Sequence, residues 1–277
     1  MKPIIIAGNG PSLAQIDYSR LPKDFDVFRC NQFYFEDRYF LGKKIKGVFF
    51  NHRLIWEFFF TMNQIRQRYE YEIQDLYSCL SPFDCEKESF EYFKTLKHYF
   101  PTVIDFYPYL REYKMIYEQI LHWYLYEKKF LNMGTYMLIT ALAQGYKEIY
   151  LVGIDFYEGR DYAFNMSGKK NLYLKIPAFE EGYTKISAHN QSFDRAIIQM
   201  IQNLNLCTLY SLSPSSPMSQ FIPLAPIQSS VFSVLQKPKN YIDDLLIPDL
   251  YPLYKKDKVK NQSILSKIKS LFSKDHQ

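Results

Sequence analysis

Three short apolar segments near the start of the chain each lead into an asparagine, and this pattern constrains the fold more than any other feature of the sequence. The segments are residues 3–7, 25–29 and 47–50. They are followed by Asn9, Asn31 and Asn51. Short runs of β-branched and aromatic residues that stop at turn residues are typical of buried strands. Because ligands bind outside the carboxyl ends of parallel strands, we expect these asparagines and Gln32 to line one crevice.

The amide side chains favour a nucleotide as the ligand of this crevice. Primary amides donate and accept hydrogen bonds without carrying charge, which suits ribose hydroxyls and the polar edge of a base. Asparagine also favours turns, and for a single position that explanation is sufficient. An asparagine at each of three successive strand ends favours a nucleotide-binding site over this explanation. A dinucleotide is disfavoured, since Leu13 occupies the place of the third glycine of the fingerprint and Asn31-Gln32 the place of the ribose-binding acid.

The alternation of strand and helix signals as far as about Leu212 predicts the fold class. Further strands are predicted at 102–106, 148–154 and 206–212, and helices at 54–68, 87–99, 111–128, 134–144 and 192–204. This order predicts an α/β fold with a Rossmann-like, doubly wound, mainly parallel sheet. Periodicity fails after Phe156, and a long loop of this kind is typical of a lid. We divide the chain into a nucleotide-binding domain (1–155 and 189–250), a lid (156–188) and a basic tail (251–277).

The acidic residues and cysteines predict a site without a metal. A metal-dependent sugar transferase would hold its ion with acidic residues at a strand end. The segment Asp24-Phe25-Asp26 opens a strand instead, and Asp155 stands alone. The four cysteines show no metal-binding spacing, which favours a reducing compartment. With no leader sequence and no apolar run of spanning length, we expect a cytoplasmic protein.

Two tyrosines are candidates for the charge stabilisation that a metal would otherwise supply. Tyr157 and Tyr162 follow a predicted strand end and enter the lid. Phenols are strong neutral donors, and two of them aimed at a phosphate can stabilise charge that builds as a bond breaks. The alternative is that both rings pack beneath the lid.

The tail carries much of the net charge of +5. Residues 255–274 contain seven lysines and one aspartate, and Ile264, Leu265, Ile268, Leu271 and Phe272 fall on one helical face. A basic helix with an apolar stripe is typical of a segment on an anionic membrane surface. A solvated tail is the alternative. Nucleic acid is not an expected partner, because the rest of the chain has no basic stripe.

Four segments of the chain resemble the bacterial sialyltransferases of glycosyltransferase family 42, which cap lipooligosaccharide with sialic acid. The segments read IIAGNGPSL (5–13), FRCNQFYFED (28–37), GYKEIYL (145–151) and GIDFY (153–157), and the likeness extends from residue 1 to about 226. The resemblance implies a GT-A variant fold, a CMP-sialic acid donor, a galactose-terminated glycan acceptor, inversion at the anomeric carbon, no metal, and a homotetramer.

The resemblance also implies roles for individual residues. The nucleotide would be held by Asn9, Asn31, Gln32 and Asn51, the leaving phosphate by Tyr157 and Tyr162, and His189 would be the base. An imidazole with its ordinary pKa near 6.5 can take a proton from an acceptor hydroxyl at neutral pH, and His52 is the rival. We also assign substrate contacts to Gly10, Ser12, Asn132, Met133, Gly134, Phe156 and Asp161.

The chain departs from the family at two places. Residues 128–134 (KKFLNMG) lack the usual arginine and Thr-Ser pair, which leaves Asn132 to offer hydrogen bonds to the donor. His52 replaces a common proline and adds a second ionisable group beside the donor. Two other functions stay open at this point: another nucleotide-dependent transferase, such as one using S-adenosylmethionine, and a catalytically inactive nucleotide- or glycan-binding protein.

Overall fold

The structure is a computed structural model that describes residues 1–51, 62, 65, 67–68, 70–78, 94–156, 162–164, 189–228, 231–239 and 241. Most of the helices predicted at 54–68 and 87–99 lies outside these residues, as do most of the lid and all of the tail. Within the described part of the chain, no helix is long and apolar enough to cross a membrane.

A seven-stranded sheet organises the molecule, and every pairing within it is parallel. Its strands are β1 (Ile4–Ala7), β2 (Asp26–Cys30), β4 (Lys44–Phe49), β5 (Glu72–Ser78), β6 (Ile104–Asp105), β7 (Glu148–Val152) and β8 (Thr208–Ser211). The strand order is β6-β5-β4-β2-β1-β7-β8. The chain adds strands on one side of β1 as far as β6 and then returns to add β7 and β8 on the other side, so β1 pairs with both β2 and β7. The predicted doubly wound parallel sheet is therefore confirmed, and its topological switch point lies between β1 and β7.

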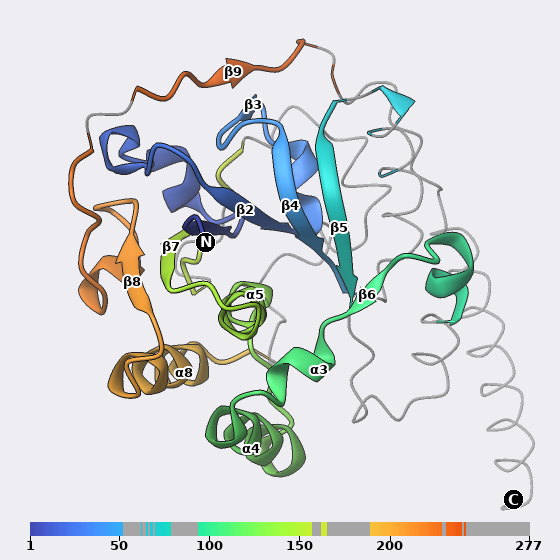
Figure 1. Ribbon diagram of the computed structural model, residues 1–277, viewed down its shortest axis with the longest axis vertical. Helices are drawn as coiled ribbons and strands as arrows, with labels where there is room; N and C mark the ends of the chain where they lie inside the picture. The colour runs from blue at the N-terminus through green and yellow to red at the C-terminus, as the bar shows by residue number, and fades with distance from the viewer. Residues whose placement is uncertain are drawn as a thin grey trace, which may run out of the picture.

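Alternate side chains of β1 pack into two separate core clusters, as the period of two in a strand requires. Ile4 and Ile6 pack on the face covered by helices, whereas Ile5 and Ala7 pack on the opposite face. The covering helices are α3 (Tyr107–Leu110), α4 (Lys114–His122), α5 (Met133–Ala143) and α8 (Gln191–Asn203), which Figure 1 shows on one side of the sheet. Burial of strands on both faces is what a parallel sheet needs.

Three parts of the architecture differ from the sequence-based expectation. Strand β5 was not predicted, because its residues EIQDLYS mix acidic and apolar side chains. The helix expected at 111–128 is divided into α4 and the π-helical turn η5 (Trp123–Glu127), and it ends where Lys128 adopts φ +55°. A second, antiparallel pair joins β3 (Arg38–Tyr39) to β9 (Leu235–Gln236).

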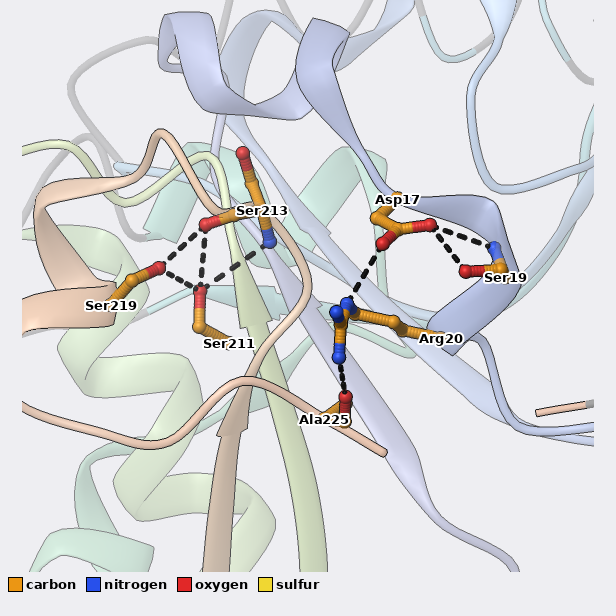
Figure 2. Close-up of polar contacts among 7 residues, drawn as sticks. All are labelled: Asp17, Ser19, Arg20, Ser211, Ser213, Ser219 and Ala225. Carbon is orange, nitrogen blue, oxygen red and sulfur yellow. Dashed lines mark hydrogen bonds and ion pairs between the residues drawn. The ribbon is translucent and has the colours of Figure 1, made fainter. Parts of the chain in front are cut away.

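Two groups of polar contacts fix the turns beside β8. Figure 2 shows them, one formed by Ser211, Ser213 and Ser219 and the other by Asp17, Ser19, Arg20 and Ala225. The hydroxyls of Ser211 and Ser219 lie 2.9 Å apart. Arg20 Nε donates to Asp17 Oδ2 at 2.8 Å, and its guanidinium also donates to the carbonyl oxygen of Ala225. The first group closes the turn that follows β8, and the second ties the segment at Ala225 to the turn at Arg20.

Candidate active site

The three strand-end asparagines lie together at the carboxyl edge of the sheet. The amide nitrogen of Asn9, which follows β1, donates to the carbonyl oxygen of Cys30 at 2.9 Å. The backbone N–H of Asn51, which follows β4, donates to Oδ1 of Asn31 at 3.4 Å. These hydrogen bonds join the ends of neighbouring strands, so the three asparagines lie near one another at this edge. Their contacts with a ligand stay a prediction.

Within the described part of the chain, Asn9 has a buried hydrogen-bond acceptor without a partner at the switch point. The residue is only 9% exposed, and no described residue donates to its Oδ1. A buried polar atom that lacks a hydrogen bond costs about 1–3 kcal/mol, so such atoms are rare unless a ligand or a water satisfies them. A bound nucleotide or sugar that donates here would remove that cost.

The turn η3 (Asn31–Phe35) presents the next two amides. Asn31 adopts φ +44°, a left-handed conformation that asparagine tolerates better than other side chains that carry a Cβ. This conformation turns the chain sharply after β2 and brings Gln32 to the same edge. Gln32 is 6% exposed, so its amide requires partners in a nearly closed environment.

The glycines after β1 are required by close backbone packing. A Cβ on Gly8 would lie 2.1 Å from the carbonyl oxygen of Gly153, and one on Gly10 would lie 2.5 Å from Asp155 Oδ2. Asp155 Oδ2 also accepts from the backbone N–H of Ser12 at 2.7 Å, and Ser12 Oγ accepts from the N–H of Gly153 at 2.9 Å. Gly10 and Ser12 therefore have structural roles beside the ligand contacts predicted for them, and Asp155 ties β7 to the first turn.

The predicted donor-binding segment 132–134 forms the start of α5. Asn132 is the N-cap, and its Oδ1 accepts from the N–H of Thr135 at 3.0 Å. Asparagine at an N-cap satisfies one of the free N–H groups of the helix. A Cβ on Gly134 would lie 2.8 Å from Ile154, so close packing explains this glycine. Met133, the first helical residue, is half-buried and packs against the core.

Asp194 is a functional candidate that the sequence interpretation missed. Its carboxylate accepts from the backbone N–H of Asn132 at 3.0 Å, and the Asn132 amide and Thr135 hydroxyl also bond to it. Burial raises the pKa of Asp194 to about 7 despite these donors. The sequence did contain a signal for a buried acid, because Asp194 lies on the apolar face of α8 in line with the buried Ile197 and Ile201. Asp194 positions the turn that begins α5.

His189, the predicted base, lies just before α8. Its Nδ1–H donates to the carbonyl oxygen of Phe130 at 3.2 Å, and the backbones of the two residues form an isolated parallel bridge. Because a carbonyl can only accept, this contact places the proton on Nδ1 and makes Nε2 the acceptor nitrogen of the neutral ring. Burial lowers the pKa of His189 from its ordinary value of 6.5, which favours the neutral form that a base requires.

Of the two predicted phenols, Tyr162 is described and lies beside Asn9. The backbone N–H of Ala163 donates to the carbonyl oxygen of Asn9 at 2.9 Å, which holds this part of the lid at the end of β1. The ring of Tyr162 stacks on that of Phe164, with centroids 5.1 Å apart. The ring of Tyr162 therefore packs against a neighbouring ring, as the alternative to a catalytic role expects. Three further predicted site residues lie outside the described residues. They are the other phenol Tyr157, the predicted substrate contact Asp161 and the rival base His52.

Phe156 holds a strained backbone conformation at the end of β7. Its φ is +51°, which costs a bulky residue roughly 1 kcal/mol or more. The Arg195 guanidinium lies over the Phe156 ring at 5.3 Å and over Phe221 at 4.3 Å. This stack stabilises the turn that leads into the lid, so Phe156 has a structural role beside the substrate contact predicted for it.

The acidic residues at the sheet edges do not form a cluster. Asp24 and Asp26 pair with Lys2 at the amino ends of the strands, at 3.3 and 3.2 Å, as expected from the strand that they open. Among the residues that the structure describes, no group of three histidines, cysteines or acids could hold a metal ion.

The open parallel sheet, with its topological switch point between β1 and β7, defines the molecule as a doubly wound α/β protein of the Rossmann type. The family model described as alpha-2,3-sialyltransferase (CST-I) matches residues 2–275. The chain therefore belongs to this family of sialyltransferases, which are glycosyltransferases.

Solved structures agree with this assignment. The chain is 40% identical to the sialyltransferase CstII from Campylobacter jejuni in complex with the substrate analogue CMP-3FNeuAc, with a TM-score of 0.79 and coverage of 93% of this chain and 99% of that one. It is 35% identical to the monofunctional alpha-2,3-sialyltransferase Cst-I from the same organism, with a TM-score of 0.79 and coverage of 95% and 96%. These neighbours share the mainly parallel α/β fold.

A curated relative matches over a shorter stretch. This chain is 36% identical over 134 residues to an uncharacterized protein of Haemophilus influenzae. The match covers 48% of this chain and 57% of that protein, so it spans little more than half of the relative's length.

Proposed function

We propose that this protein transfers sialic acid from CMP-sialic acid to a terminal galactose or sialic acid of a lipooligosaccharide-type glycan, with inversion and without a metal. The observation that carries the proposal is the buried Oδ1 of Asn9 at the switch point, to which no residue in the described part of the chain donates. CstII, a 40% identical neighbour, is a sialyltransferase that binds a CMP-sialic acid analogue, which supports the same donor here.

The proposed reaction is a single displacement at the anomeric carbon. The acceptor hydroxyl attacks this carbon, the bond to the phosphate oxygen breaks, and CMP leaves with the bonding electrons. Nε2 of His189 takes the hydroxyl proton, and the hydrogen bond from Nδ1–H to Phe130 keeps the ring in the required tautomer. Tyr157 and Tyr162 donate to the phosphate as its charge grows.

Ligand-dependent stability and turnover test this function. CMP should raise the melting temperature of the protein, whereas S-adenosylmethionine should not. Incubation with CMP-sialic acid and a galactoside should yield a sialylated product whose anomeric configuration, read by NMR, is opposite to that of the donor. Stabilisation by CMP without any turnover on galactosides or sialosides would instead identify a binding protein.

The assembly and location of the protein belong to the same proposal. We propose a homotetramer in the cytoplasm that contacts the anionic inner face of the inner membrane through residues 255–274. The seven lysines and the apolar stripe of that segment support the contact. Sedimentation of the full chain without vesicles measures its oligomeric state, and sedimentation with anionic vesicles measures its membrane contact.

A further inference from the structure

We propose that a strap near the carboxyl end of the described chain, residues 231–239 and 241, positions the nucleotide-binding turn η3, and that Lys237 and Tyr241 are the positioning residues. The proposal deepens the proposed function, on which its nucleotide part rests. In Figure 1 the strap runs over one edge of the sheet and reaches β3. There Leu235 pairs with Tyr39 and Gln236 with Arg38, in antiparallel register.

The strap donates hydrogen bonds to the carbonyl oxygens of the last two residues of η3. Lys237 Nζ donates to the carbonyl oxygen of Tyr34 at 2.8 Å, and Tyr241 Oη donates to that of Phe35 at 2.6 Å. Terminal carbonyls of a helical turn have no partner within the turn and need one when they are buried. Tyr34 and Phe35 are 1% and 0% exposed, so the strap supplies partners that water does not.

The Lys237 ammonium lies in a closed cage of aromatic rings. Its side chain is 0% exposed and forms an ion pair with Glu70 at 3.1 Å. The nitrogen lies 5.3, 4.9 and 4.6 Å from the ring centroids of Tyr39, Tyr71 and Tyr241. A buried ammonium is tolerated only when such contacts offset its desolvation. The position of the strap is therefore closely specified.

The cage continues into an ion pair that fixes the other side of η3. Arg29 Nη2 lies 2.8 Å from Glu36 Oε2, and both side chains are buried. The hydroxyl of Tyr71 donates to Glu36 Oε1 at 2.7 Å, so the cage and this pair share Tyr71. Arg29 lies in β2, two residues before η3 begins at Asn31, and Glu36 is the C-cap that follows η3. The turn is thus held at both ends, and Asn31 and Gln32 lie between these anchors.

This arrangement gives the strap a defined consequence for binding. The amides of Asn31 and Gln32 can meet a nucleotide in one geometry only if η3 does not move. Loss of the strap contacts should let the turn sample other conformations, and the apparent affinity then falls with the fraction of competent molecules. The effect should appear in nucleotide affinity rather than in the chemical step.

Hydrogen exchange and CMP binding by variants of the full chain test the inference. Tyr241→Phe removes one hydroxyl and keeps the ring over Lys237, so the fold should persist. Lys237→Met empties the cage of its charge, and Lys239→Met is the matched control, because Lys239 is an exposed lysine of the same strap. In the unliganded protein, Tyr241→Phe should speed amide exchange in residues 31–36 but not in α8, and the control should match the wild type.

Calorimetric titration at a temperature where each variant is folded should show CMP binding about five- to tenfold weaker in Tyr241→Phe, the worth of one buried hydrogen bond. The donor KM should rise in parallel, with kcat within about twofold of wild type. Normal exchange in residues 31–36, or faster exchange with unchanged CMP affinity, would overturn the inference. If Lys237→Met does not fold, Tyr241→Phe still decides. A wild type that binds no CMP would refute the proposed function, whereas the exchange experiment would still test whether the strap fixes η3.

Discussion

Replacing Asp194 with asparagine should stabilise the protein by an amount that grows with pH. Asp194 is 1% exposed, and burial raises its pKa from 3.8 to about 7. Because the raised pKa belongs to the folded state, the folded protein binds more protons than the unfolded chain between these values. The free energy of unfolding therefore falls as the pH rises from about 4 to 7, and this contribution is constant above that range.

The magnitude follows from the two pKa values. With 3.8 for the unfolded chain and about 7 for the folded protein, ionisation of Asp194 costs about 2 kcal/mol at pH 5 and about 4 kcal/mol at pH 8. The amide oxygen of Asp194→Asn still accepts from the N–H of Asn132, which lies 3.0 Å away in the native protein. The variant thus avoids the cost of the buried charge and keeps the main hydrogen bond.

Urea denaturation at pH 5 and pH 8 measures the effect. The gain of Asp194→Asn over the wild type should be about 2 kcal/mol larger at pH 8. Asp24→Asn is the control, because the Asp24 side chain is 77% exposed and its ion pair with Lys2 should contribute less than about 1 kcal/mol at either pH. An equal gain at both pH values, or a loss at pH 8, would refute the reasoning about burial.

Four further predictions concern catalysis and location. His189→Ala should lower kcat about 10²–10⁴-fold with CMP affinity nearly unchanged. The acidic limb of the pH–rate profile should lie below pH 6.5 in the wild type and vanish in the variant. A larger loss of kcat in His52→Ala would assign the base to His52. Tyr157→Phe and Tyr162→Phe should each lower kcat more than CMP affinity, and the opposite pattern would assign them to ground-state binding. EDTA should not change turnover, whereas a loss that magnesium or manganese restores would require a metal. Deletion after Tyr254 should release the protein from anionic vesicles and spare activity on a soluble acceptor; equal partitioning of both forms at low salt would exclude the membrane contact.

The sequence predicted those parts of the molecule that local patterns encode. Short apolar runs with turn residues at their ends identified β1 and β2, and the rule for parallel sheets then brought Asn9 and Asn31 to one edge. The cap at Asn132 has a local signal as well, since asparagine before an apolar helix is typical of an N-cap. Strand β5 has no clean alternation, and its neighbours in the sheet rather than its own residues determine its conformation.

Contacts between distant residues account for the rest. Asp155 holds the N–H of Ser12 across 143 residues of sequence, and Lys237 reaches the carbonyl oxygen of Tyr34 across 203. No periodicity or spacing predicts such pairs, because each depends on how complete layers pack. The elevated pKa of Asp194 is of the same kind, since it arises from burial against the start of α5.

The contacts of Asn9 show why an amide side chain suits the end of β1 better than a carboxylate. Its Nδ2 donates to the carbonyl oxygen of Cys30 at 2.9 Å, and this bond joins the ends of β1 and β2. The Oδ1 of the same amide is buried and accepts from no described donor. Aspartate would lose the donor and bring a negative charge toward the anionic nucleotide of the proposed donor, whereas alanine would lose both the donor and the acceptor. Only a side chain that donates and accepts can hold two strands together and still offer an acceptor to the ligand.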